Sequence, residues 1–131
     1  MASEFVAIKM IGLDDRASRP VHAGAAMFRM VILLSAQAPS EWAQYFNGQW
    51  KQHIYMMKRK AIVSGNTLVI ECVPDELEND HMQELRAILD KTNSAYSEFM
   101  ARKQQVLAAE EARKAEAGAK MTALKNKIKF D

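Results

Sequence analysis

The chain has 131 residues, of which 49% are hydrophobic and 26% are charged. This composition is typical of a folded protein and excludes an intrinsically disordered chain, and the length suffices for one domain with its own hydrophobic core. The 18 Lys and Arg residues outnumber the 16 Asp and Glu residues only slightly, for a net charge of +2. Net charge alone therefore does not indicate a polyanionic partner, and any electrostatic function must come from local clusters.

The N-terminal residues 5–13 are rich in β-branched and aromatic types and predict a strand. Residues 14–26 show no apolar period and contain a proline and a glycine, which indicates an unusually long loop. Residues 27–36 predict a second strand. This strand is apolar on both faces from 30 to 34, so we expect it to be central in its sheet.

Residues 39–53 predict a helix, because their large side chains recur at helical spacing on one face. Pro39 suits the first turn of this helix. Its four large aromatic residues are Trp42, Tyr45, Phe46 and Trp50. One helix face is too narrow to bury four such side chains side by side, so we expect one of them at a contact with another chain.

The segment KRKAIVSGNTLVIEC, residues 58–72, predicts a β-hairpin around its Gly-Asn pair. In the register of a two-residue turn, Lys60 lies opposite Glu71 and Val63 lies opposite Leu68. Because side chains alternate along a strand, the three cations at 58–60 cannot all point the same way. This argues against a nucleic-acid site made by the basic triplet alone.

Apolar residues at helical spacing from Leu85 to Val106 predict a second helix that packs on the sheet, with Asn79 or Asp80 as its N-cap. Residues 108–119 continue the helix with Ala, Glu, Lys and Arg but no large apolar side chain. The last residues form a short basic amphipathic tail.

The element order β-β-α-β-β-α predicts an α+β fold, a two-layer sandwich with a four-stranded, largely antiparallel sheet and a long C-terminal helix. We assign residues 1–103 to an α+β domain and residues 104–131 to a helical extension that ends in the basic amphipathic tail. The longest aliphatic run, 30–34, is too short to cross a membrane, and no signal peptide is recognisable. We therefore expect a cytoplasmic protein with no membrane partner.

No pattern in the sequence indicates an enzyme. The three histidines, His22, His53 and His81, are isolated from one another and from the single Cys72, so the spacing of a metal site is missing. No nucleophile motif surrounds Cys72, which we expect to be a small buried apolar side chain. The glycines are scattered singly rather than gathered in a phosphate-binding loop. We expect no catalytic residue, no metal and no cofactor.

The function we predict is a non-enzymatic protein–protein interaction module that self-associates or docks on a partner through its long C-terminal helix. Residues 100–131 extend past any four-stranded sheet, and a helix with so weak an apolar face is marginal in water. The expected contact residues, mostly large and apolar, are Trp50, Met56, Met57, Arg59, Met121, Leu124 and Ile128.

Two alternatives follow from other features of the sequence. The first is a nucleic-acid-binding protein whose affinity falls steeply with salt. Its basic contact residues would be Arg16, Arg19, Lys51, Lys58, Arg59, Lys125 and Lys127. The second is a small-molecule-binding protein or enzyme in which residues 14–26 form a lid over a pocket.

Overall fold

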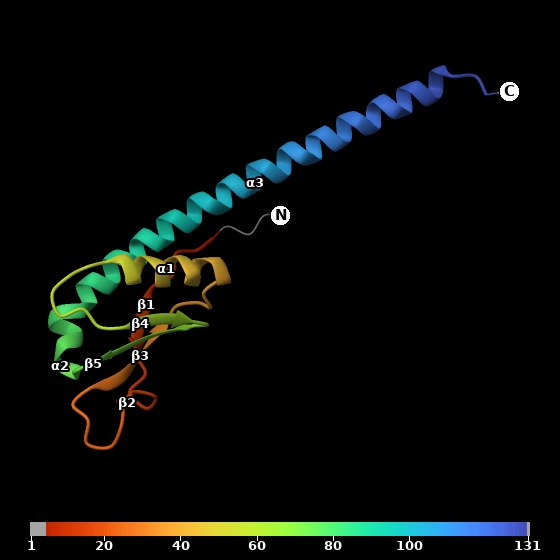
Figure 1. The fold of residues 1–131 in the computed structure, drawn as a ribbon. Coiled ribbons are helices and arrows are strands. Elements are labelled where there is room, and N and C mark those ends of the chain that lie inside the picture. The colour runs from red at the N-terminus through yellow and green to blue at the C-terminus, as the bar shows by residue number, and fades with distance from the viewer. Residues whose placement is uncertain (1–4, 131) are drawn as a thin grey trace. The chain divides into compact units, whose positions relative to one another are not determined.

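Five antiparallel strands form one sheet in the computed structural model, which describes residues 5–130. The strands are β1 (Met10–Leu13), β2 (Arg19–Pro20), β3 (Phe28–Leu34), β4 (Ala61–Ser64) and β5 (Thr67–Cys72). Their order is β1-β3-β5-β4, and the short β2 pairs with β3 off this path (Figure 1). The predicted α+β class is confirmed. The extra strand, β2, lies inside the segment predicted as a loop.

The predicted hairpin is confirmed together with its register. Ala61 faces Ile70 and Val63 faces Leu68, while the backbone N–H of Glu71 donates to the carbonyl of Lys60 at 3.1 Å. The turn residue Gly65 has a φ of +62°, a conformation that glycine adopts without steric cost. β5 also pairs with β3 along its whole length, so β3 is central in the sheet, as predicted.

The first strand is shorter than predicted and begins at Met10. The backbone of Ile8, just before it, is bonded to a side chain instead of a strand. Its N–H donates to Oδ1 of Asn93 at 3.0 Å, and its carbonyl accepts from Nδ2 of Asn93 at 2.8 Å. The prediction of a strand over residues 5–13 was therefore correct only at its C-terminal end.

The helix α1 (Ser40–Gln52) agrees with its prediction, except that Pro39 precedes the first turn as the N-cap residue. Trp42, Phe46 and Trp50 stack in one column, with ring centroids 5.8 and 6.3 Å apart and ring planes within 9° of parallel. All three are at most 2% exposed. Because residues four apart lie above one another on a helix, the column needs the width of only one ring. Trp50, predicted as a partner contact, is therefore buried within its own chain.

The second helical segment begins earlier than predicted. It consists of α2 (Pro74–Glu76), the π-helical turn η1 (Leu77–His81) and α3 (Met82–Lys127). Pro74 occupies the first helical position, where its missing N–H is not needed. Asn79 and Asp80 lie inside the π-helical turn, so the prediction that one of them caps the helix was wrong.

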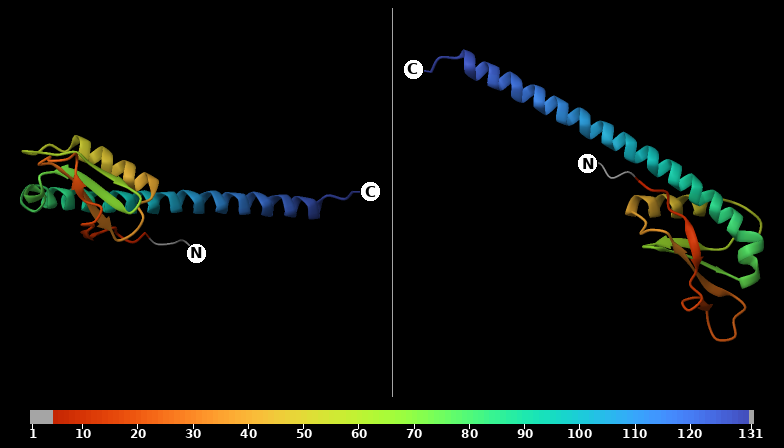
Figure 2. Two further views of the ribbon diagram at one scale, coloured as in Figure 1. Left: turned by 90° about the horizontal axis from the view of Figure 1, so that it is seen from below. Right: turned by 180° about the vertical axis from the view of Figure 1, so that it is seen from behind.

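The core lies between one face of the sheet and the helices. α1 and the first turns of α3 lie side by side on one side of the sheet in Figures 1 and 2, and Trp42 Nε1 donates to Asn93 Oδ1 between them at 3.0 Å. Alternation along the strands directs one set of side chains toward this layer. The fully or nearly buried apolar residues of this core include Met30, Ile32, Leu34, Val63, Leu68, Ile70, Cys72, Leu85, Ile88 and Leu89.

The chain divides into two units. Residues 6–96 form one, which contains the sheet, α1 and the first turns of α3, and the residues from 97 onward belong to the other. Every side chain from 101 to 130 is exposed. Within residues 5–130, no helix is both long enough and apolar enough to cross a membrane.

Candidate ligand-binding groove

A groove of about 740 Å³ lies on the unit formed by residues 6–96, where β3, β4, β5 and α1 meet the segment that precedes β4. Five cationic side chains and a single carboxylate line it. Its lining residues are Arg29, Asn47, Trp50, Lys51, Lys58, Arg59, Lys60, Ala61, Ile62, Val69 and Glu71. Positive charge is thus concentrated here, although the whole chain carries a net charge of only +2.

The sheet register explains the arrangement of the groove floor. Arg29 of β3 pairs with Glu71 of β5, and Glu71 lies opposite Lys60. Directly opposed residues of an antiparallel sheet point to the same face, so these three side chains form a charged row across the sheet. The next row on this face contains Val69 and Ile62, which are also paired. This is the face opposite to the one that buries Leu68 and Ile70.

Two of the five cations are engaged in contacts within the protein. Lys58 donates its ammonium to the main-chain carbonyl oxygens of Trp50 and, at 3.1 Å, of Lys51, where it satisfies carbonyls at the C-terminal end of α1. Arg59 donates two hydrogen bonds of 2.9 Å to the carboxylate of Glu76. Arg29, Lys51 and Lys60 form no hydrogen bond or ion pair through their side chains with any described residue.

A partly buried hydrogen-bond network fixes the segment beside the groove. Its members are Arg59, Glu76, His81 and Tyr55: His81 Nε2 lies 3.4 Å from the Glu76 carboxylate and Nδ1 lies 2.7 Å from the Tyr55 hydroxyl. The hydrogen bonds from Arg59, assisted by His81, lower the pKa of Glu76 to about 2. Burial raises the pKa of Tyr55 to about 12, so this hydroxyl keeps its proton and can donate to Nδ1. This network links the loop after α1 to α2 and η1.

The single cysteine has no feature of a nucleophile. Cys72 is fully buried on the core face of β5. Burial, together with the nearby carboxylate of Glu76, raises the pKa of its thiol to about 11. The prediction that Cys72 is a small buried apolar residue is confirmed by this placement.

The free edge of β4 is closed by side chains of α1. Asn47 accepts a hydrogen bond of 2.8 Å from the N–H of Val63 and donates one of 3.2 Å to its carbonyl. Trp50 Nε1 donates to the carbonyl of Arg59 at 3.0 Å. An additional strand would need these same backbone groups, so this edge is protected against strand pairing.

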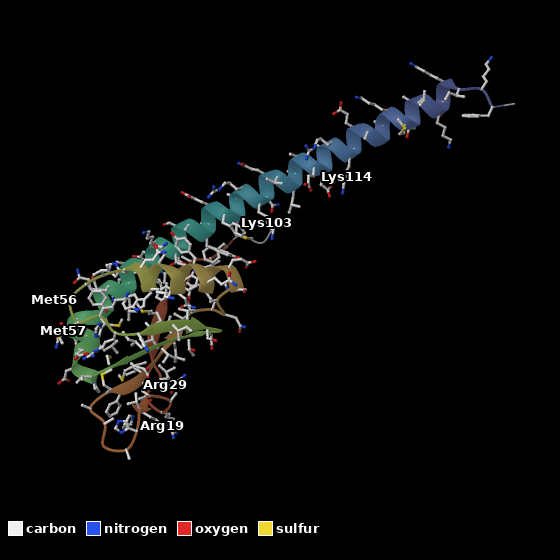
Figure 3. All side chains as sticks on the ribbon, viewed as in Figure 1. Arg19, Arg29, Met56, Met57, Lys103 and Lys114 are labelled. Carbon is white, nitrogen blue, oxygen red and sulfur yellow. The ribbon has the colours of Figure 1, made fainter. Side chains whose placement is uncertain are left out.

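The remaining predicted contact residues are divided between the two units. Met56 and Met57 are exposed on the loop after α1, and Met57 has a φ of +60°, which is unusual for a residue other than glycine (Figure 3). Met121 and Leu124 are exposed on α3, and Ile128 is exposed directly after its last residue.

The predicted nucleic-acid residues are also only partly brought together. Lys51, Lys58 and Arg59 line the groove. Arg19 pairs with Arg29 at the edge of the charged row, close to it in Figure 3, while Arg16 lies in the preceding turn. Lys125 and Lys127 belong to the other unit. The segment predicted as a lid, residues 14–26, contributes no residue to this groove.

The predicted hairpin register already placed Lys60, Glu71, Ile62 and Val69 on one face, but sequence reasoning did not join Arg29 to them. The isolated charge of Arg29 in an otherwise apolar strand was the available signal. Its neighbours could not be identified, because the pairing of β3 with β5 joins segments that are far apart in the sequence.

No metal site is evident among residues 5–130, since no three His, Cys, Asp or Glu side chains gather closely enough to hold an ion. No family model matches the sequence, and neither a curated protein nor a solved structure matches it significantly.

Proposed function

We propose that this protein is a non-enzymatic interaction module that self-associates through the part of α3 after residue 100. The observation that supports this proposal is the exposure of large apolar side chains on that segment. Val106, Leu107, Met121, Leu124 and Ile128 are each between 44% and 62% exposed. A second helix of the same kind would remove this surface from water, which is the main driving force for association.

The apolar side chains also lie in a favourable arrangement for pairing. At 3.6 residues per turn, Val106, Met121 and Leu124 fall within an arc of about 60° on the helix. Ile128, which follows α3 and whose N–H donates to the carbonyl of Leu124, lies in the same arc. They therefore form one stripe, not a scattered set. Between its two ends lies the segment 108–119, which contains six alanines. Alanine favours the helix and allows a close approach of two helices.

The charges within this stripe favour an antiparallel pair. Glu110 and Arg113 lie on the same side of α3 as the apolar residues, by the same helical spacing. A parallel pair would place Glu110 beside Glu110 and Arg113 beside Arg113 of the second copy. An antiparallel pair with its midpoint between these two residues places each Glu110 beside an Arg113, and it places each Leu124 beside the exposed Phe99 of the second copy. Opposite charges at such positions set the orientation of paired helices.

Sedimentation equilibrium on matched variants tests the proposal. L124E/I128E places two charges in the stripe, and T122E/N126E places two charges on the opposite face of the same turns. We expect the first variant to be monomeric at concentrations where the wild type and the second variant associate. Far-UV circular dichroism verifies that helix content is retained. Equal association of the two variants would contradict the proposal.

A chain truncated after Arg102 provides an independent test of self-association. It retains every buried residue of the sheet and helices and should be monomeric. If light scattering finds the full-length and truncated chains to be monomers of equal stability, residues 103–131 do not mediate self-association. The orientation is tested separately, because E110R should weaken an antiparallel pair and E110R/R113E should restore it.

A further inference from the structure

We propose that the groove on the open face of the sheet binds an acidic peptide segment of a partner protein, with an apolar side chain of the peptide seated on Ile62 and Val69. This site lies within residues 6–96 and goes beyond the self-association proposed for α3. Each of the two proposals can fail without the other.

The charges of the groove select an anionic partner. Arg29, Lys51 and Lys60 come from β3, from α1 and from the residue before β4, and all three line the same groove. They have no ion pair with a described residue, so their charges are available to a ligand. Convergence of like charges in a concave surface raises the local concentration of anions. Lys58 and Arg59 add to this field, although their side chains are already held by internal hydrogen bonds.

The apolar part of the groove distinguishes a peptide from a simple anion. Ile62 is 54% exposed although it lies within a strand, and it supplies most of the apolar surface, while Val69 beside it is 9% exposed and forms the floor. An ion such as phosphate would leave this apolar surface in water. An acidic segment that carries Leu, Ile or Phe would cover it, while its carboxylates contact the surrounding cations.

Two features of the groove disfavour nucleic acid. The only aromatic lining residue, Trp50, is 2% exposed, so no ring is available for base stacking. Glu71 lies between Arg29 and Lys60 in the charged row. It interrupts the positive charge along which a continuous phosphate backbone would lie, whereas the separate carboxylates of a peptide can contact the cations on either side of it. Because Asn47 and Trp50 close the edge of β4, the peptide would bind through its side chains and not as an added strand.

Fluorescence anisotropy at low salt tests this site with a defined probe. The probe is a short fluorescein-labelled peptide rich in Glu, with Leu at every third position. There are three comparison probes. One peptide has Lys in place of Glu, a second has Ala in place of Leu, and the third probe is single-stranded oligothymidylate. We expect the Glu–Leu peptide to bind the full-length protein more tightly than any comparison probe, and its affinity to fall as salt is added.

Matched variants locate the binding. R29Q/K60Q removes two groove cations and should raise the Kd of the Glu–Leu peptide about tenfold. A change of this size corresponds to the summed free energies of two modest ion pairs. K9Q/R86Q removes two exposed cations outside the groove and should leave the Kd unchanged within about twofold, as expected for distant surface charges. Ile62→Ser should weaken binding of the Leu peptide but not of its Ala counterpart. Tryptophan fluorescence and circular dichroism verify that each variant is folded.

Three results would overturn the proposal. The first is no binding of the Glu–Leu peptide at low salt. The second is an equal loss of affinity in R29Q/K60Q and K9Q/R86Q, which would mean nonspecific attraction. The third is tighter binding of oligothymidylate that R29Q/K60Q abolishes, which would make the groove a nucleic-acid site. None of these results depends on the oligomeric state, so failure here leaves the self-association proposal intact.

Discussion

Two stretches of the single helix α3 differ completely in burial. Leu85, Ile88 and Leu89 are at most 5% exposed, whereas Val106 and Leu124 on the same helix are about half exposed. Both stretches are helical, so secondary structure does not explain the difference. The first stretch packs within the unit of residues 6–96, and the second belongs to a unit with no buried side chain from 101 to 130. Helix formation here is a local property, and burial requires a partner surface.

The largest expected effect comes from truncating the middle of the aromatic column. Phe46→Ala removes a fully buried ring that contacts Trp42 and Trp50 and should lower the free energy of unfolding by about 3–5 kcal/mol. Denaturant unfolding followed by tryptophan fluorescence measures this, because both tryptophans of the chain, Trp42 and Trp50, lie in the column.

The matched change in the other region is Leu124→Ala. It deletes a large apolar side chain that is about half exposed, so it should not shift the tryptophan-detected midpoint at a protein concentration where the chain is monomeric. A shift comparable with that of Phe46→Ala would mean that the segment after residue 100 stabilises the sheet, and the contrast between the two regions would fail.

A smaller effect is expected for the asparagine that joins three parts of the fold. Asn93 bonds both backbone groups of Ile8 and the indole N–H of Trp42. Asn93→Ala leaves these groups without their partner and should cost about 1–3 kcal/mol. The control is Asn126→Ala on the exposed part of α3, which should change the tryptophan-detected unfolding very little. Equal effects of the two substitutions would show that the bonds to Asn93 are not stabilising.

The features that could be predicted from the sequence are those determined by neighbouring residues. The Gly-Asn turn fixed the register of β4 and β5, and the spacing of large residues located α1. The helical character of residues 108–119 followed from their alanines and charged residues. In each case the relevant contacts join residues close in the chain.

The features that could not be predicted depend on contacts between distant segments. The groove requires β3 to lie beside β5, which brings Arg29 to Glu71. Alternation along a strand assigns a residue to a face but does not identify the neighbouring strand. The stacking of Trp42, Phe46 and Trp50 was missed for a different reason, because four aromatic residues were counted across the helix face instead of along it. Ile8 was assigned to a strand because its partner, Asn93, is a side chain.

The smallest expected effect concerns two ion pairs between a glutamate and a cation, one pair in each region. Glu76 accepts two hydrogen bonds from Arg59 and its side chain is 12% exposed, whereas the pair Glu116–Lys120 is 3.6 Å apart and about 70% exposed on both sides. The pKa of Glu76 is lowered from 4.5 to about 2, so the folded protein favours the ionised form. The resulting stabilisation is fully present above pH 4.5 and is lost as the pH falls toward 2.

Glu76→Gln should therefore reduce stability at neutral pH and flatten the decline in the tryptophan-detected midpoint between pH 4.5 and 2. Glu116→Gln should leave both the midpoint and its pH dependence as in the wild type, because exposed pairs on a helix contribute little. A decline as steep in Glu76→Gln as in the wild type would show that other carboxylates govern acid unfolding. In that case the bonds from Arg59 would position the loop beside the groove without stabilising the fold.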